Sequence, residues 1–225
     1  MDSIRGVGAV IVAAGSSERM GGVDKISCLL KGKPLLAWSV DVCQECPVVQ
    51  QIVIVLQEHN MRLGESLVQE RGWTKASVCL GGPKRQDSAK EGMKRLRDCR
   101  WAVMHDGARP FLTPELIWNG VEAARETGAA VAAVPVKDTI KLADDGGLVT
   151  ATLERRRLWA IQTPQVFALD VIAQAYQELT TEVSDDAAAV ELGEGAVKLY
   201  MGSYRNIKVT TSEDLMLAEV LAQYG

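Results

Sequence analysis

Small residues and two cations share one short segment near the start of the chain. An apolar run ends at Ala13, Ala14 and Gly15, and Arg19 and Lys25 follow shortly after. The small side chains keep bulk away from the backbone, so its N–H groups can face a ligand closely. A strand that feeds such a loop beside fixed positive charges suits a polyphosphate. The alternative is a strand-to-helix turn that needs small residues only for packing.

A glycine-rich segment forms the second candidate. It begins at Gly81 and Gly82 and runs through Arg85 to Ser88. Close backbone approach and the Ser88 hydroxyl could read the edge of a nucleobase. Alternatively, a helix capped by Asp87 or Ser88 could hold an anion at its N-terminus. A plain connecting loop explains the same residues about as well.

Acidic and basic residues follow a third apolar run. Asp106 comes directly after the strand expected over residues 101–105, where it could accept a ribose hydroxyl, position a substrate or hold a metal. Arg109 could reach a phosphate, although an Asp–Arg pair that stabilises the loop is the alternative. His105 is expected to be a packed strand residue rather than a general base.

Lys208 is a cation in the otherwise apolar segment 206–210, which we expect to be a strand. A lysine of this kind usually serves as a charge on an edge strand. Three other basic segments could surround the same pocket, which favours a functional role for Lys208.

Apolar runs that alternate with helical patterns must position these residues. The pattern predicts an α/β fold with a Rossmann-like, mostly parallel sheet covered by helices on both faces. The loops after parallel strands meet at one edge, where ligands bind in such folds. We expect one domain over residues 1–225. The expected strands are 8–13, 52–56, 76–80, 101–105, 129–134, 161–167, 197–201 and 207–210. The expected helices are 35–43, 61–71, 87–96, 113–127, 169–179, 185–192 and 212–222.

The alternation is interrupted between residues 136 and 159. Two strand-like runs, 136–142 and 148–153, flank an Asp-Asp-Gly-Gly turn signal, which predicts a hairpin. The segment carries Thr139 and Arg155. An isolated hairpin is marginally stable, so we expect a projecting arm that packs on a second copy in a dimer. A hairpin folded flat on its own domain is the alternative.

Composition excludes several classes of function. The 225 residues carry a net charge of -4 and 5% aromatic residues, which argues against nucleic-acid binding. The chain lacks an apolar run of membrane-spanning length. Its N-terminus resembles neither a signal nor a transit peptide, which favours the cytoplasm, or a plastid stroma if a leader was removed. Five cysteines fit reduced thiols, and we expect Cys43 and Cys46 to be structural.

Several motifs occur in one order along nearly the whole chain, from about residue 7 to residue 219. They are the Arg19-Met20 and Lys25 loop, Gly81-Gly82-x-x-Arg85-x-x-Ser88, His105-Asp106-x-Ala108-Arg109-Pro110, Val136-Lys137-Asp138-Thr139-Ile140-Lys141, Leu158-Trp159-x-x-Gln162-Thr163-Pro164-Gln165, Ser184-Asp185-Asp186-Ala187 and Asn206-Ile207-Lys208-Val209-Thr210. Together they resemble the 2-C-methyl-D-erythritol 4-phosphate cytidylyltransferases of the non-mevalonate isoprenoid pathway. Asp24 stands where that family usually has Pro, and Ser184 where it usually has Thr.

The resemblance implies a reaction in which CTP and methylerythritol phosphate give the CDP-alcohol and pyrophosphate. It also implies a homodimer whose arm carries Thr139 and Arg155 into the partner's site. Mg²⁺ would be held mainly through the CTP phosphates, with no metal ligand assigned to the protein. The implied catalytic residues are Arg19, Lys25, Arg155 and Lys208. The implied nucleotide-binding residues are Ala13, Ala14, Gly15, Gly81, Gly82, Arg85, Ser88 and Asp106. The implied acceptor-binding residues are Asp106, Arg109, Thr139, Arg155, Thr163, Ser184 and Lys208.

Three other functions remain open at this point. A ribitol-5-phosphate cytidylyltransferase would share the fold and the chemistry. A molybdopterin guanylyltransferase shares part of the opening loop but lacks the arm and the Gln162–Gln165 segment. A non-catalytic nucleotide sensor would need affinity, but not the cations Arg19, Lys25 and Lys208 around the reacting phosphates.

Overall fold

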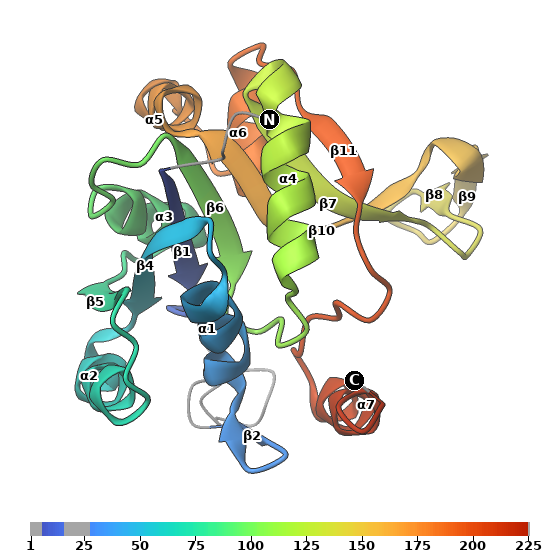
Figure 1. Cartoon of the computed structure of the whole chain (residues 1–225). Helices are drawn as coiled ribbons and strands as arrows, with labels where there is room; N and C mark the ends of the chain where they lie inside the picture. The colour runs from blue at the N-terminus through green and yellow to red at the C-terminus, as the bar shows by residue number, and fades with distance from the viewer. Residues whose placement is uncertain (1–5, 16–27, 225) are drawn as a thin grey trace.

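A seven-stranded sheet forms the centre of the molecule (Figure 1). The computed structural model describes residues 6–15 and 28–224. The strand order is β11-β7-β10-β6-β1-β4-β5. The strands are β1 (Val7–Val12), β4 (Val49–Leu56), β5 (Ala76–Leu80), β6 (Trp101–Asp106), β7 (Ala129–Pro135), β10 (Trp159–Ala168) and β11 (Lys198–Met201).

The sheet is mostly parallel, as the sequence predicts. β1 pairs in parallel with β4 and β6, β4 with β5, and β11 with β7. Only β10 runs against its neighbours β6 and β7 in this sheet. The continuous apolar runs of β1, β4 and β6 are explained by burial on both faces of the sheet.

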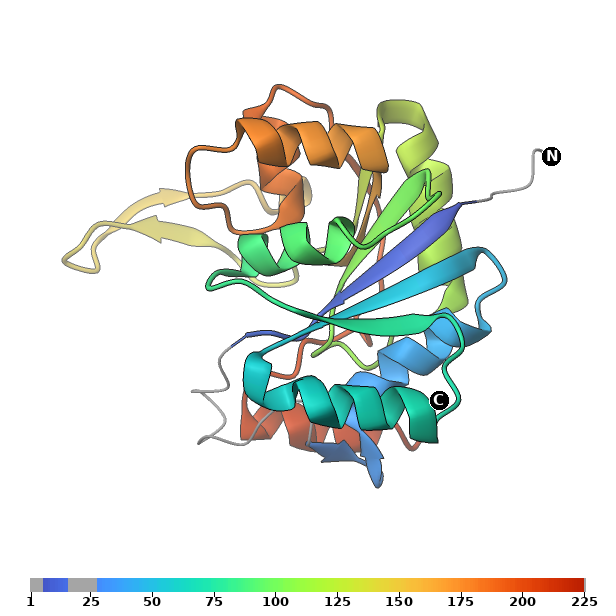
Figure 2. The ribbon, with the colours of Figure 1, turned by 90° about the vertical axis from the view of Figure 1, so that its left-hand side faces the viewer.

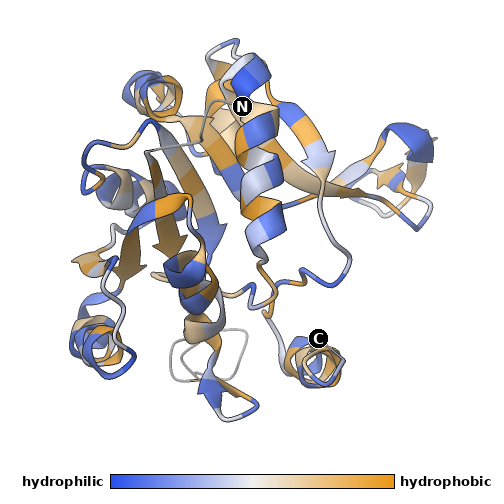
Figure 3. Ribbon diagram, in the orientation of Figure 1, coloured by the Kyte–Doolittle hydropathy of each residue, from blue (hydrophilic) through white to orange (hydrophobic). Residues whose placement is uncertain are grey.

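Helices cover both faces (Figures 1 and 2). One core lies between the sheet and α1 (Leu35–Glu45), α2 (Met61–Glu70) and α4 (Pro114–Thr127). The opposite core lies under α3 (Arg85–Met93), α5 (Leu169–Glu178) and α6 (Asp186–Leu192). Figure 3 shows the apolar colours concentrated in the central strands and the hydrophilic ones on the outer faces of the helices. This arrangement confirms the predicted α/β fold.

A smaller apolar cluster joins the segment around residues 30–38 to the C-terminal end of the described chain. α7 (Ser212–Leu221) packs beside the short strands β2 (Leu29–Leu30) and β3 (Lys33–Pro34). Buried Leu30, Leu35 and Val209 belong to this cluster. Two single turns of 3-10 helix, Glu58–Asn60 and Arg155–Arg157, complete the elements. None of the helices in residues 6–15 and 28–224 is long and apolar enough to cross a membrane.

The segment between β7 and β10 forms a projecting hairpin (Figures 1 and 2). Its strands β8 (Lys141–Ala143) and β9 (Val149–Thr152) pair antiparallel, and every residue in them is exposed. The Asp144 carboxylate accepts hydrogen bonds from the backbone N–H groups of Gly146 and Leu148, which fixes the turn. The projecting arm is therefore confirmed, and the alternative of a hairpin folded flat on its domain is wrong.

Three expected elements differ in the structure. The first hairpin strand, expected over residues 136–142, is limited to β8 at Lys141–Ala143. Residues 207–210 do not form a strand; the Val209 N–H donates to the Ala108 carbonyl at 2.8 Å, so this extended segment is bound to a loop rather than to a sheet edge. α3 begins at Arg85 rather than at residue 87, because Asp87 acts from inside the first turn by accepting from the Lys84 N–H.

Candidate active site

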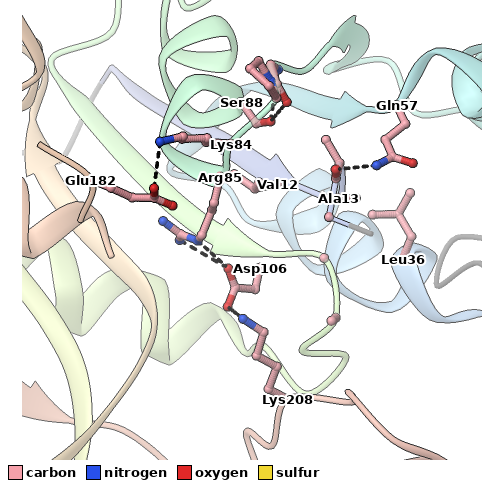
Figure 4. A pocket seen from close by; sticks show the side chains of 16 residues that line it. Val12, Ala13, Leu36, Gln57, Lys84, Arg85, Ser88, Asp106, Glu182 and Lys208 are labelled. Carbon is pink, nitrogen blue, oxygen red and sulfur yellow. Dashed lines mark hydrogen bonds and ion pairs between the residues drawn. The ribbon is translucent and has the colours of Figure 1, made fainter. Parts of the chain in front are cut away.

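A cavity of about 490 Å³ opens at the carboxyl ends of β1, β4, β5 and β6 (Figure 4). This is where a parallel sheet is expected to bind ligands, and the volume suits a nucleotide-sized molecule. The lining residues come from the ends of these strands, from α1 and α3, and from the segments after α5 and after β11. They are Val12, Ala13, Ala14, Gly15, Leu36, Gln57, Gly82, Pro83, Lys84, Arg85, Ser88, Asp106, Gly107, Ala108, Glu182 and Lys208.

The small residues of the cavity allow close backbone packing. A side-chain carbon at Gly81 would lie 2.7 Å from both the Ala14 methyl carbon and the Ser88 hydroxyl oxygen, so only glycine fits there. The Ser88 hydroxyl lies 3.2 Å from both the N–H and the carbonyl of Gly82. The Ala14 carbonyl accepts a hydrogen bond from the Gln57 side chain at 3.0 Å. These contacts fix the path of the backbone that a ligand would meet.

Three cations converge on the Asp106 carboxylate (Figure 4 shows two of them). Lys208 Nζ lies 2.9 Å from one carboxylate oxygen, and Arg85 Nη2 lies 3.3 Å from the other. Arg109 Nε approaches at 3.7 Å, which is too long for a hydrogen bond. Burial opposes ionisation of Asp106, but the charges of Arg85, Lys208 and Arg109 outweigh it and hold its pKa well below the usual range. Asp106 is therefore a carboxylate at neutral pH.

Arg85 is also held from its other side. Its Nη2 lies 2.9 Å from a carboxylate oxygen of Asp186, whose side chain is completely buried. The Tyr176 hydroxyl donates to the second oxygen of Asp186. Burial opposes the charge of Arg85, but Asp186 and Asp106 raise its pKa above the ordinary value. The guanidinium group is thus fixed between two carboxylates with its charge retained.

A buried polar layer supports Asp106 from behind. The Thr163 hydroxyl accepts the Asp106 N–H at 3.0 Å and lies 3.0 Å from His105 Nδ1. His105 Nε2 lies 3.1 Å from the Arg109 carbonyl, so the ring donates there and accepts from Thr163. Burial lowers the pKa of His105 to about 4, although the hydrogen bond to the Arg109 carbonyl and the charge of Asp106 act in the opposite direction. His105 is therefore a neutral packed residue, as the sequence predicts.

The structure brings most of the predicted site residues together. Eight of them line the cavity: Ala13, Ala14, Gly15, Gly82, Arg85, Ser88, Asp106 and Lys208. Gly81, Arg109 and Thr163 pack directly behind these residues. Thr139 and Arg155 belong to the arm and Ser184 is exposed before α6, so none of the three is among the lining residues. Arg19 and Lys25 lie outside the described residues, and their predicted roles stay predictions.

Sequence reasoning missed several residues of the site. Lys84 and Glu182 form an ion pair of 2.7 Å at the rim of the cavity, and Gln57 lies in its wall. Lys84 and Asp186 stood inside motifs that were recognised, so their positions could have indicated a role. Tyr176 gave no signal, because its contact with Asp186 depends on how α5 packs against α6.

The described parts of the chain contain no cluster of metal ligands, and both thiols of the Cys43-x-x-Cys46 pair are buried. No group of three His, Cys, Asp or Glu side chains there could hold a metal ion. Cys43 and Cys46 are buried free thiols, and burial raises the pKa of Cys43. Both residues pack in the apolar core between α1 and the sheet, in agreement with a structural role.

Sequence comparison identifies relatives over nearly the full length. The family model of 2-C-methyl-D-erythritol 4-phosphate cytidylyltransferase matches residues 7–223. An enzyme of that name from Dehalococcoides mccartyi (strain ATCC BAA-2266 / KCTC 15142 / 195) is 50% identical over 220 residues, covering 97% of each chain. One from Alkaliphilus oremlandii (strain OhILAs) is 39% identical over 97% of this chain and 96% of its own.

Solved structures agree with the sequence comparison. A 4-diphosphocytidyl-2C-methyl-D-erythritol synthase from Anaerococcus prevotii superposes with a TM-score of 0.88 at 29% identity, covering 97% of this chain and 96% of that one. The 2-C-methyl-D-erythritol 4-phosphate cytidylyltransferase from Thermus thermophilus gives a TM-score of 0.77 at 27% identity, with 96% and 98% covered. With the family model, these matches show that the chain belongs to the 2-C-methyl-D-erythritol 4-phosphate cytidylyltransferase family.

Proposed function

We propose that the cavity at the strand ends holds CTP and the acceptor phosphate while the chain carries out the reaction of its family. That reaction transfers the cytidylyl group of CTP to 2-C-methyl-D-erythritol 4-phosphate and releases pyrophosphate. The observation that carries the proposal is the convergence of Arg85, Arg109 and Lys208 on Asp106 beside the glycine-rich loop. Fixed cations at this place can attract and orient two anionic substrates.

The transfer step requires positioning rather than a catalytic base. A phosphate monoester is already an anion at neutral pH, since its second pKa is about 6. An oxygen of the acceptor phosphate forms a bond to the α-phosphorus of CTP, and the bond from that phosphorus to the bridging oxygen of the β-phosphate breaks. Pyrophosphate leaves with the electron pair. The barrier comes from bringing negative charges together, so preorganised cations supply most of the catalysis.

We assign the residues of the cavity by their positions. The small residues Ala13 to Gly15 and the Gly82 segment accommodate the cytidine and its phosphates, with Ser88 holding Gly82 in place. Asp106 accepts a hydroxyl hydrogen bond from ribose or acceptor. Lys208, the most exposed of the cations around Asp106, exchanges its ion pair for the acceptor phosphate. Arg19 and Lys25 would stabilise the pentacoordinate phosphorus and the leaving pyrophosphate.

Magnesium fits this site only as an ion bound largely by the substrate. Asp106 is a single carboxylate already shared by Arg85 and Lys208, and the described residues offer no three-ligand cluster. Of the residues that the structure describes, Asp106 alone would therefore contact the ion, while triphosphate oxygens and water fill the remaining positions, as is common for Mg²⁺. When bound, the ion neutralises charge on the triphosphate.

The arm supports a dimer that shares its active sites. Its Leu142, Leu148 and Val149 are large apolar side chains that are about half exposed or more. Arg155 donates to the Lys137 carbonyl at 2.9 Å and remains exposed at the base of the arm. A second copy would cover the apolar side chains and receive Thr139 and Arg155 beside its Lys208.

The activity is tested by pyrophosphate release in parallel wells. CTP and Mg²⁺ are combined with methylerythritol phosphate in one well and with ribitol 5-phosphate in the other. We expect release with methylerythritol phosphate at least about a hundredfold faster, because a site built to pair substrate hydroxyls discriminates strongly. Equal or faster release with ribitol 5-phosphate would overturn the assigned acceptor.

The shared site is tested by mixing two inactive variants, Arg155→Ala and Lys208→Ala. In a mixed dimer, the intact cavity of the Arg155→Ala chain receives the intact arm of the Lys208→Ala chain. Random exchange makes about half of the dimers mixed, with one working site each, so about a quarter of wild-type activity should return. A mixture that remains inactive after exchange of tagged subunits has been demonstrated would place Arg155 in the site of its own chain.

A further inference from the structure

A second cavity, of about 460 Å³, lies beside the loop that follows β6. It is formed by one side of α1, by that loop, by the segment after β11 and by the end of α7. The lining residues that matter here are Trp38, Asp41 and Glu45 of α1, Phe111 of the loop, Arg205 of the segment after β11 and Leu221 of α7. The volume is in the range of small-molecule sites, and the reaction of the family leaves this cavity without a role.

Aromatic and aliphatic side chains form its walls. Trp38 of α1 and Phe111 of the loop are half-buried, with ring centroids 6.4 Å apart and planes tilted by 57°. The indole N–H of Trp38 donates to the Leu30 carbonyl at 3.3 Å, so its polar atom is already paired. Leu112 and Leu221 add aliphatic surface. Such walls favour a flat aromatic ligand.

One cation in the wall of the cavity is available to an anionic group. Asp41 pairs with Lys33 at 2.6 Å and with Arg71 at 2.7 Å, so its charge is balanced. Arg205 is different: Nη2 donates to the Leu221 carbonyl at 2.9 Å, and among the residues that the structure describes it pairs with no carboxylate. A guanidinium has five N–H donors, so most remain available. The lining as a whole carries two cations, Lys33 and Arg205, and two carboxylates, Asp41 and Glu45, so Arg205 is the point in the wall where an anionic group can pair.

The loop after β6 and the segment after β11 each line both this cavity and the active site, and so connect the two. The Arg109 carbonyl accepts from the Ser39 hydroxyl of α1 at 3.1 Å and lies directly before Pro110 in the cavity wall. Arg109 Nη1 donates to the Asn206 carbonyl at 2.8 Å. Asn206 itself stands between Arg205, which lines the second cavity, and Lys208, which lines the first.

We propose that the second cavity is a binding site for a small aromatic monoanion, with its rings against Trp38 and Phe111 and its anionic group on Arg205. Because Arg205 and Lys208 are three residues apart on one segment, occupancy alters how Lys208 meets the acceptor phosphate. This coupling between the two cavities rests on the proposed function, whereas the binding site does not.

Binding is tested with 1-anilinonaphthalene-8-sulfonate, which carries two aromatic systems and one sulfonate. Its fluorescence is titrated with the full-length chain. We expect one saturable site, weakened at least about fivefold by Arg205→Gln, since a lost charge-assisted contact costs this much or more. Glu45→Gln removes the opposing charge and should strengthen binding about twofold.

Three controls make the binding test decisive. Arg125→Gln removes an arginine from α4, where it pairs with Glu122 at 3.6 Å, and should leave the affinity unchanged. Lys84→Gln alters the first cavity only and should also have no effect. All variants must keep the wild-type melting temperature, because the dye also binds partly unfolded chains. No saturable binding, an Arg205→Gln affinity equal to that of Arg125→Gln, or weakening by Lys84→Gln would overturn the site.

The coupling between the two cavities is tested by measuring pyrophosphate release at the dye concentrations used in the binding titration. At saturation we expect the KM for the acceptor to change at least twofold, and the dye concentration that produces half of this change should be the same in the wild type and in Arg125→Gln but at least about fivefold higher in Arg205→Gln. An unchanged KM in a chain that demonstrably binds the dye would refute the coupling and leave the binding site intact. A chain without turnover in the absence of dye would instead refute the proposed function.

Discussion

The active-site cavity and the arm differ in how far their side chains are buried and paired within a single chain. Around the cavity, Asp106, Arg85 and Asp186 form ion pairs among themselves, and the two carboxylates are nearly or completely buried. On the arm, every residue of β8 and β9 is exposed. One chain therefore fixes the geometry of the cavity, whereas the arm presents side chains that its own chain does not cover.

This difference predicts where mutations act. Substitutions around the cavity should change the folding stability and the chemistry of a single chain, because each buried charge depends on its neighbours. Substitutions on the arm should leave folding almost unchanged and act on association. The following variants test this division, beginning with the largest expected effect.

Lys208→Ala should lower kcat/KM by a factor of about 10² to 10³, because it removes a fixed cation from a site where charge accumulates. Steady-state pyrophosphate release measures the effect. Lys198→Ala on β11 is the matched control, since Lys198 is also partly exposed and pairs with a glutamate, Glu126. Near-normal turnover of Lys208→Ala, or an equal loss in the control, would remove Lys208 from the catalytic residues.

Acidification should destabilise the cavity side through His105. The pKa of His105 is lowered to about 4 by burial, against an ordinary value of about 6.5. The unfolded chain therefore binds the proton first as pH falls, and stability is lost between about pH 6.5 and pH 4. The total loss is on the order of 3 kcal/mol.

Urea unfolding across that pH range measures the loss. His105→Gln should flatten the dependence between pH 6.5 and pH 4, whereas His59→Gln, in the turn before α2, should retain it. Asp106 affects stability at a lower pH than His105. Because the pKa of Asp106 is depressed in the folded chain, the stability that its ionised form contributes is lost as the pH falls below the ordinary pKa near 3.9. A flat wild-type profile down to pH 4 would contradict the buried neutral imidazole.

Residues directly after parallel strands were the most predictable part of the site. Ala13 follows β1 and Asp106 ends β6, and the neighbouring positions of these strands in the sheet bring both to one edge. The apolar runs of β1 and β4 predicted their own burial on both faces. Local patterns therefore sufficed wherever the fold class itself decides which residues meet.

Contacts between distant segments could not be predicted in this way. Asp186 meets Arg85 from a helix far along the chain, and no local pattern indicates that pair. Lys208 was expected on a strand because residues 206–210 are apolar around it, yet an extended segment bound to Ala108 has the same composition. The proposed role of Arg155 depends on a second chain, which sequence pattern alone does not position.

Tyr176→Phe should destabilise the chain by about 2 kcal/mol, because the buried Asp186 carboxylate loses a hydrogen-bond donor. For a chain of this size the melting temperature would fall by about 4–8 °C. Tyr204→Phe is the control, since its hydroxyl donates to the Pro135 carbonyl at 2.7 Å but its side chain is 48% exposed. Equal shifts for both tyrosines would refute the special dependence of the cavity on its buried pairs.

Leu148→Glu at the tip of the arm should have the smallest effect on folding and a clear effect on assembly. Leu148 is 71% exposed, so the change in unfolding free energy of a single chain should stay within about 0.5 kcal/mol. A charge placed in the proposed apolar contact between copies should nevertheless weaken the proposed dimer. Sedimentation velocity over a dilution series measures the association, and urea unfolding at low concentration measures the folding.

Leu192→Glu on α6 provides the matched control, because Leu192 is 63% exposed and receives the same substitution away from the arm. We expect this control to sediment as the wild type does, while Leu148→Glu shifts toward the single chain and loses activity in parallel. The parallel loss is the sharper observation, because it connects an exposed side chain outside the cavity to turnover inside it. Dimers that persist in Leu148→Glu would show that the tip of the arm lies outside the contact between copies.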